Sequence, residues 1–259
     1  MTHLTRTSIA KICAVPRRTA ALVLVGTLLT AATLGTAPSF AQDVYPSRPI
    51  TLVIPFPPGG SSDVVGRLVG KRLSELLGQS VVIDNRPGAG TVVGAGYVAK
   101  AAADGYTLLL SSGSTFTVNP AIRQNLPYDP IKSYEPIGIV ARIPLILLAN
   151  KNVPVNNVKE FVDAVKASPG KYAYASFGAG TTSQFTGEIM LQAVDAKILH
   201  VPYKGSAPAM TDLMGGQVPF SVDTVTAAIP QLKSGKIKAI AVTTAKRSSQ
   251  LPDVPTFAE

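Results

Sequence analysis

Five short segments of the chain combine glycine with serine or threonine, or place hydroxyls around a charged residue, and each follows a predicted strand. The segments are 56–63, 111–115, 177–183, 203–206 and 223–226. Glycine exposes backbone N–H groups and the hydroxyls can donate further hydrogen bonds, so such loops suit an anion, most simply a carboxylate. For any single loop, the alternative interpretation is that its Ser, Thr or Asp side chains simply cap the following helix. The repetition of the pattern favours an anion site built from neutral donors rather than from an ion pair.

The elements that must position these loops alternate between short strands and helices. Apolar residues predict strands at 51–54, 81–83, 106–110, 172–175, 197–201, 218–222 and 237–242, and helical spacing predicts helices at 64–77, 92–102, 158–167, 184–194, 207–214 and 227–233. This alternation is typical of an α/β fold with a mainly parallel sheet covered on both faces. In such sheets, ligands bind beyond the carboxyl ends of the strands. Two similar units, joined near 137–150, indicate two lobes with a cleft between them.

The charge of the chain is divided unevenly between its N-terminus and the rest. The chain has 259 residues, 24 basic and 15 acidic side chains, a net charge of +9 and 46% hydrophobic residues, which predicts a folded protein. Four basic residues and no acidic one precede an uncharged run at 19–41, the pattern of a secretory signal peptide cleaved after Ala41. A retained membrane anchor is the alternative, although its apolar core is short. The remaining charge, +5, is too dispersed for a nucleic-acid partner.

The sequence offers few residues for metal binding, disulfide bonds, cofactor binding or hydrolysis. The single cysteine, Cys13, lies in the signal segment, and one cysteine with two histidines is too few for a zinc site, so we expect no metal and no disulfide framework. Residues 88–94 resemble a dinucleotide loop, but we interpret them as a turn before a tightly packed helix and expect no cofactor. An exported serine hydrolase is the alternative function. It would need a serine from 61–62 or 111–114 and His200, which the apolar pattern around it predicts to be a packed structural residue.

Three charged residues lie near the predicted loops. Asp63 is expected to interact with the dipole of the helix that it begins, but it could also accept a hydrogen bond from a ligand ammonium group. Asp223, at a strand end, is a candidate for a polar contact with ligand or water. Lys204 could neutralise a second carboxylate or remain solvated.

Seven motifs carry a resemblance to a known family. They are IPFPPGGSSD (54–63), NRPGAG (85–90), ADGYTLL (103–109), LPYDP (126–130), HVPYKGSAP (200–208), LMGGQV (213–218) and LPDVPT (251–256). In this order they resemble the Bug family, the periplasmic receptors of tripartite tricarboxylate transporters. The resemblance implies a type II periplasmic binding protein that closes around a small carboxylate. It implies a first lobe at 42–143 and a second at 144–242. Residues 243–259 would begin a return to the first lobe, which chain beyond Glu259 would complete in a longer protein.

The loops and the resemblance together give the candidate ligand-binding residues. They are Phe56, Gly59, Gly60, Ser61, Ser62, Asp63, Ser111, Ser114, Thr115, Gly180, Thr181, Thr182, Ser183, Tyr203 and Asp223. The resemblance implies a periplasmic, monomeric, non-enzymatic receptor for a di- or tricarboxylate or an acidic amino acid. Its partners would be membrane transporter subunits or a sensor protein.

Overall fold

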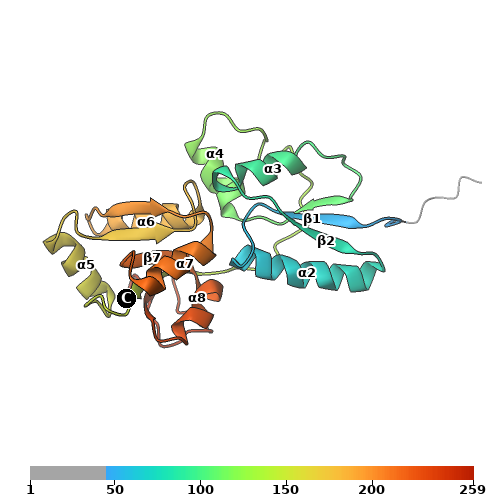
Figure 1. The fold of residues 1–259 in the computed structure, drawn as a ribbon. Helices are drawn as coiled ribbons and strands as arrows, with labels where there is room; N and C mark the ends of the chain where they lie inside the picture. Colours follow the sequence, from blue (N-terminus) through green and yellow to red (C-terminus); the bar gives the residue numbers. More distant parts are fainter. Residues whose placement is uncertain (1–44) are drawn as a thin grey trace, which may run out of the picture. The chain divides into compact units, whose positions relative to one another are not determined.

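The computed structural model describes residues 45–259 (Figure 1). The predicted signal peptide and its cleavage point at Ala41 lie outside the described residues. Among residues 45–259, no helix has both the length and the apolar character that crossing a membrane requires.

The first sheet has three parallel strands in the order β2-β1-β3. They are β1 (Ile50–Ile54), β2 (Val81–Asn85) and β3 (Thr107–Leu109), with helix α2 (Ser61–Leu77) after β1 and helix α3 (Val92–Val98) after β2. Helix α2 ends at Gly78, which adopts the left-handed conformation that favours glycine. Helix α3 stops at Val98, four residues before the predicted end. The β-α-β-α-β order of the sequence analysis is therefore confirmed.

Segment 88–94 is a turn leading into a packed helix, as the sequence predicts. Gly94 lies so close to its neighbours that an added Cβ would stand 2.7 Å from the carbonyl oxygen of Arg86 and 2.8 Å from Cβ of Pro55. Glycine at this point allows α3 to approach the chain that leaves β1.

Between the sheets, the chain forms a π-helical turn, η2 (Ser114–Val118), and a short helix, α4 (Asn119–Ile122). Residues 123–144 have no further helix or strand.

The second sheet has five strands in the order β6-β5-β7-β4-β8. They are β4 (Leu145–Asn150), β5 (Ala173–Ser176), β6 (Leu199–Pro202), β7 (Phe220–Thr224) and β8 (Ile237–Val242). Strand β5 is parallel to β6 and β7, whereas β4 is antiparallel to both β7 and β8. This sheet is therefore mixed, and the expectation of a mainly parallel arrangement holds only for part of it.

Helices cover both faces of the second sheet. They are α5 (Val158–Ala167), α6 (Thr182–Ala193), α7 (Ser206–Gly215) and α8 (Val225–Leu232). Leu147 of β4 belongs to a buried cluster with Phe161 of α5, and its neighbour Leu148 belongs to a second cluster with Leu213 of α7. Successive side chains of a strand point to opposite faces, so β4 contributes to both cores.

Residues beyond β8 stay with the second sheet. Thr256 forms a bridge with Val242, the N–H of Phe257 donates to the carbonyl of Val242 at 2.8 Å, and Leu251 packs on the cluster that contains Leu213. The chain end lies among the helices of this sheet in Figure 1. We expected 243–259 to begin a return to the first lobe, but the contacts of 251–257 are with the second sheet.

Candidate functional site

The loop between β1 and α2 is held in place by a buried aspartate. Asp63 is 4% exposed, and its carboxylate accepts from the N–H of Gly59 (3.1 Å), Nδ2 of Asn85 (3.1 Å) and Nε of Arg67 (3.0 Å). Burial opposes ionisation, but hydrogen bonds from Arg67, Gly59 and Asn85 outweigh it and hold the pKa of Asp63 below its ordinary value. The carboxylate of Asp63 therefore stabilises the conformation of the β1–α2 loop through internal hydrogen bonds.

Three of the helices that follow these loops have an N-cap residue that forms no side-chain capping hydrogen bond. These residues are Gly60 of α2, Thr181 of α6 and Gly205 of α7, whereas Thr224 accepts from the N–H of Ala227 and caps α8. The first N–H groups of a helix have no partner inside it and carry the positive end of the helix dipole. Helix starts left open in this way can bind an anion.

Loops of the first and second sheets meet at the starts of α2 and α7. A Cβ added to Gly60 would lie 3.7 Å from Cβ of Ser206, and the ring of Pro57 packs 2.8 Å from the Cβ position of Gly205. Ser61 of α2 also shares a hydrogen bond with the hydroxyl of Thr224. Two open helix starts and one capped start therefore converge.

Aromatic side chains of two loops meet as well. The ring of Phe56, in the β1–α2 loop, contacts that of Phe177, in the β5–α6 loop, edge to face with centroids 6.2 Å apart.

A second junction joins 111–115 to the start of α6. The N–H of Thr182 donates to Oγ of Ser114 at 3.0 Å, so Ser114 partly caps this helix from outside. Within the segment, the hydroxyls of Ser111 and Thr115 share a hydrogen bond of 2.5 Å, and Thr115 also donates to Oγ1 of Thr91 at 2.7 Å.

The sequence analysis did not identify Asn119, which links the segments of this second junction by hydrogen bonds. Asn119 is fully buried, and its amide nitrogen donates to the carbonyls of Gly90 (2.6 Å), Ser114 (2.7 Å) and Gly180 (3.3 Å). Its side-chain oxygen accepts from Arg123 at 2.7 Å. Asn119 follows no strand and belongs to no glycine-rich loop, so no pattern in the sequence singles it out.

Several predicted site hydroxyls are already engaged inside the protein. Ser183 donates to the carbonyl of Val222 (2.6 Å), and Thr181 donates to the carbonyl of Gly178 (2.6 Å). Tyr203 donates to Asp212 of α7 (2.7 Å). These side chains support the loops, so their hydroxyl protons are not free for an anion.

Asp223 is buried rather than open to a ligand. It is 0% exposed, and it accepts from Oγ of Ser206 (2.7 Å) and from the N–H of Thr224 (2.7 Å). Burial raises the pKa of Asp223 to about 6, and the hydrogen bonds from Ser206 and Thr224 only partly oppose this. The structure therefore does not support the predicted direct contact between the Asp223 carboxylate and a ligand.

The geometry of His200 pairs it with neither of the serine clusters that the hydrolase alternative would use. Its Nε2 shares a hydrogen bond of 2.7 Å with the fully buried Ser176, and its ring lies 5.0 Å from that of Tyr174. Burial lowers the pKa of His200, although the charge of Glu188 opposes this. His200 is half-buried and packs on residues of β5, as expected for a structural histidine, and the candidate serines at 61–62 and 111–114 are not its partners.

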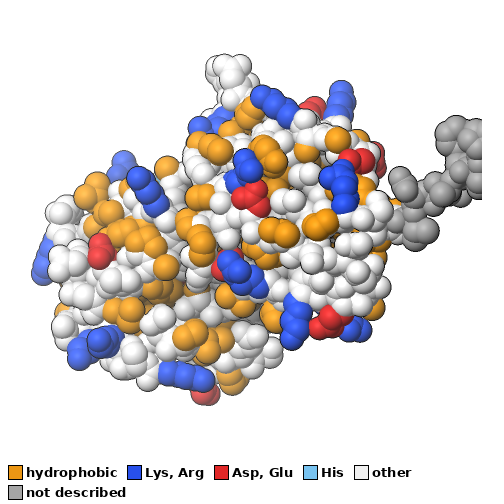
Figure 2. All heavy atoms as spheres, turned by 45° about the vertical axis from the view of Figure 1, so that its right-hand side comes forward, with side chains coloured by type: hydrophobic (Ala, Val, Ile, Leu, Met, Phe, Trp, Pro, Cys, Tyr) orange, Lys and Arg blue, Asp and Glu red, His pale blue; other side chains and the backbone are white. Residues whose placement is uncertain are grey.

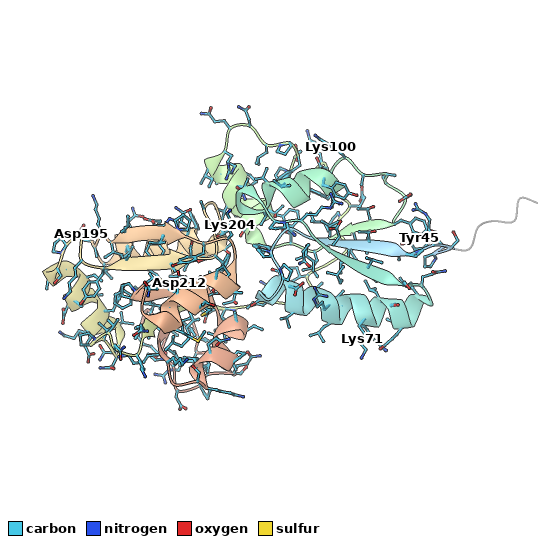
Figure 3. The ribbon with its side chains drawn as sticks, in the orientation of Figure 1. Tyr45, Lys71, Lys100, Asp195, Lys204 and Asp212 are labelled. Carbon is cyan, nitrogen blue, oxygen red and sulfur yellow. The ribbon has the colours of Figure 1, made fainter. Side chains whose placement is uncertain are left out.

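Charged side chains of both signs are scattered over one face of the molecule. On the face drawn in Figure 2, Lys and Arg side chains are interspersed with Asp and Glu. Lys204 is exposed, in the loop before α7 (Figure 3). Within residues 45–259, no group of three or more His, Cys, Asp or Glu side chains gathers in a way that could hold a metal ion. A hollow of about 570 Å³ is lined by residues between Pro120 and Ser133 rather than by the five loops.

Two α/β units whose strand-end loops meet at open helix starts define a periplasmic binding protein fold, and comparisons with known proteins support that class. Residues 65–259 match the tripartite tricarboxylate transporter family receptor, and the chain belongs to this family. It is 40% identical to Protein BugT of Bordetella pertussis over 229 residues, which is 88% of this chain and 70% of BugT.

Solved structures agree with this assignment. The periplasmic binding protein BugD is 40% identical (TM-score 0.77), covering 82% of this chain and 71% of BugD. R. palustris Rpa4515 with adipate is 39% identical (TM-score 0.80), covering 83% of this chain and 72% of that protein. MatC from Rhodopseudomonas palustris with bound malate is 34% identical (TM-score 0.78), covering 82% and 72% respectively.

Proposed function

We propose that this protein is a periplasmic solute receptor that captures a small carboxylate, either a di- or tricarboxylate or an acidic amino acid. It passes the ligand to a tripartite tricarboxylate-type transporter or to a signalling partner and performs no catalysis. The family assignment supports this proposal, as do the adipate and malate bound to two of its structural neighbours.

The observation that carries the proposal is the meeting of the open starts of α2 and α7. Their N–H groups offer hydrogen bonds and positive dipole ends at one point, next to Gly60 and Ser206. The loop after β3 and the start of α6, joined through Ser114 and Thr182, form the other side of the site. The candidate residues of the sequence analysis that lie in these loops provide the backbone groups that grip the ligand.

A thermal-shift panel on the full-length mature protein tests the proposal. Binding to the native state raises its stability by about 2.7 kcal/mol when the ligand is at 100 times its Kd. The panel contains succinate, malate, adipate, citrate and aspartate, and the matched control is succinamide, which has the shape of succinate without its charges. The chain contains no Trp, so intrinsic fluorescence is a poor alternative.

Calorimetry then measures the affinity of each carboxylate that raises Tm. The proposal requires at least one Kd below about 1 mM, equivalent to about −4 kcal/mol, with no response to succinamide. A uniform lack of carboxylate binding would refute it. Uptake of the labelled ligand by cells with and without the protein separates a transport role from a signalling role.

A further inference from the structure

The buried carboxylate of Asp223 fixes the direction of a chain of hydrogen bonds. An ionised carboxylate only accepts hydrogen bonds. Ser206 therefore directs its hydroxyl proton to Oδ2 of Asp223 (2.7 Å), and Thr224 directs its own to Oδ1 (3.3 Å). Both hydroxyl protons are thus used inside the protein.

The same reasoning assigns a direction to the hydrogen bond between Ser61 and Thr224. A hydroxyl has a single proton, and we assign that of Thr224 to the carboxylate of Asp223, which makes Ser61 the donor and Thr224 the acceptor. Thr224 also accepts from the N–H of Ala227 at 3.4 Å, which leaves it no free lone pair. Ser61 and Ser206 keep unused lone pairs but no free proton.

These two serines stand at the open helix starts that the proposed function assigns to a ligand carboxylate. Ser61 is the first residue of α2 and Ser206 the first residue of α7, and the Cβ position of Gly60 lies 3.7 Å from Cβ of Ser206. Backbone N–H groups at this point donate hydrogen bonds, whereas the two hydroxyl oxygens accept them. The site therefore suits a ligand that carries a hydrogen-bond donor beside its carboxylate.

We propose that Asp223 is a specificity-determining residue which, through Ser61 and Ser206, selects carboxylates that carry a neighbouring hydroxyl or ammonium group over unsubstituted ones. This inference rests on the proposed function. Asp223 acts as a positioning residue, since it is fully buried and touches the ligand only through the serines. An unsubstituted diacid leaves the lone pairs of Ser61 and Ser206 without a donor when it excludes water, and this weakens its binding.

Calorimetry of the full-length mature protein with succinate, malate and aspartate tests the inference, because these four-carbon diacids differ only in a hydrogen, a hydroxyl or an ammonium group. We expect malate or aspartate to bind at least about tenfold more tightly than succinate. Preference for malate alone identifies the hydroxyl as the recognised donor, and preference for aspartate alone identifies the ammonium group. Equal affinities for all three would overturn the inference but leave the proposed function intact, whereas no binding of any carboxylate would reject the proposed function itself.

Two variants then test the role of Asp223. Asp223→Asn replaces one acceptor oxygen with an NH₂ donor. The hydroxyl bonded to this NH₂ group then accepts instead of donating, and its own proton becomes free. The preference for malate or aspartate over succinate should therefore fall to within about threefold. Asp163→Asn, on the exposed surface of α5, is the matched control and should keep the wild-type preference. An unchanged preference in folded Asp223→Asn overturns the inference.

If circular dichroism finds Asp223→Asn unfolded, Ser61→Ala provides the test instead, because it removes one acceptor and keeps the two side-chain donors to Asp223. Retention of the full preference in that variant overturns the inference too.

Discussion

Oγ of Ser114 accepts a hydrogen bond from the backbone N–H of Thr182 at 3.0 Å, although the two residues lie 68 positions apart in the chain. This bond joins the loop after β3 of the first sheet to the first turn of α6, which covers the second sheet. Asn119 reinforces the same junction through the carbonyl of Gly180. The two units therefore contact each other through polar groups of the loops that the proposed function assigns to the ligand.

Removal of the Ser114 hydroxyl should weaken ligand binding. Ser114→Ala leaves the N–H of Thr182 without its acceptor, so the contact between the two loops loses about 1 kcal/mol and the carboxylate Kd rises roughly five- to tenfold. Calorimetry measures this change. Ser168→Ala, at the end of α5, is the control and should stay within about twofold of the wild type. An unchanged Kd in Ser114→Ala would show that the junction does not contribute to binding.

The close approach of α3 to the chain after β1 predicts a stability effect at Gly94. Gly94→Ala places a methyl group 2.7 Å from the carbonyl oxygen of Arg86, and a backbone group cannot move aside easily. We expect a loss of about 2 kcal/mol and a Tm lower by roughly 5 °C.

A second glycine-to-alanine change serves as the control for Gly94→Ala. Gly215 is also helical, and its added methyl would have only Gln217 at 4.0 Å. Gly215→Ala should therefore leave Tm unchanged or raise it slightly, because alanine is the better helix former. Equal Tm values for both variants would contradict the packing interpretation of 88–94.

Periodicity in the sequence predicts most of the local elements because each depends on neighbouring residues. Helix α5 has the same bounds, Val158–Ala167, as the predicted helix, since Asn157 caps it by accepting from the N–H of Glu160 and apolar residues recur at helical spacing. The five glycine and hydroxyl loops were located in the same way. In the structure, four of them follow a strand, and 223–226 comprises the last two residues of β7 and the first two of α8.

Contacts between distant residues could not be predicted from the sequence in this way. The antiparallel direction of β4 depends on which strands it pairs with, and those are β7 and β8, far along the chain. In the sequence, Asp223 looks like an accessible polar residue at a strand end. In the structure, Ser206 of the neighbouring helix α7 donates a hydrogen bond to its buried carboxylate. Asn119 is equally hidden because its three carbonyl partners come from three separate segments.

Neutral donors in the site predict that binding depends little on salt and not on Lys204. This lysine is exposed, so Lys204→Ala should leave the carboxylate Kd within about twofold of the wild type. An increase of ionic strength from about 0.05 to about 0.5 M should raise Kd by less than about threefold, because buried interactions are screened less than exposed ion pairs. A large loss of affinity in either experiment would identify a cation as the main anchor of the ligand.

The raised pKa of Asp223 predicts how pH affects stability. Its pKa of about 6 in the folded protein exceeds the ordinary 3.8, so the folded state binds more protons than the unfolded state between these values. Stability from this group is therefore present below about pH 4 and is lost as the pH rises through about 6, by an amount on the order of 3 kcal/mol. Asp223→Asn carries no charge, and its Tm relative to the wild type should rise between pH 4 and pH 7.

The comparison between the two proteins at each pH removes the effect of His200. The pKa of His200 is lowered by burial, so its folded state binds fewer protons than the unfolded state, and its contribution to stability is lost as the pH falls. This trend is opposite to that of Asp223 and is common to both proteins, so it cancels in the difference of their Tm values. Thermal melts at half-unit steps of pH measure that difference. If it stays constant from pH 4 to pH 7, Asp223 titrates in the folded protein at its ordinary pKa, and its burial does not penalise its charge.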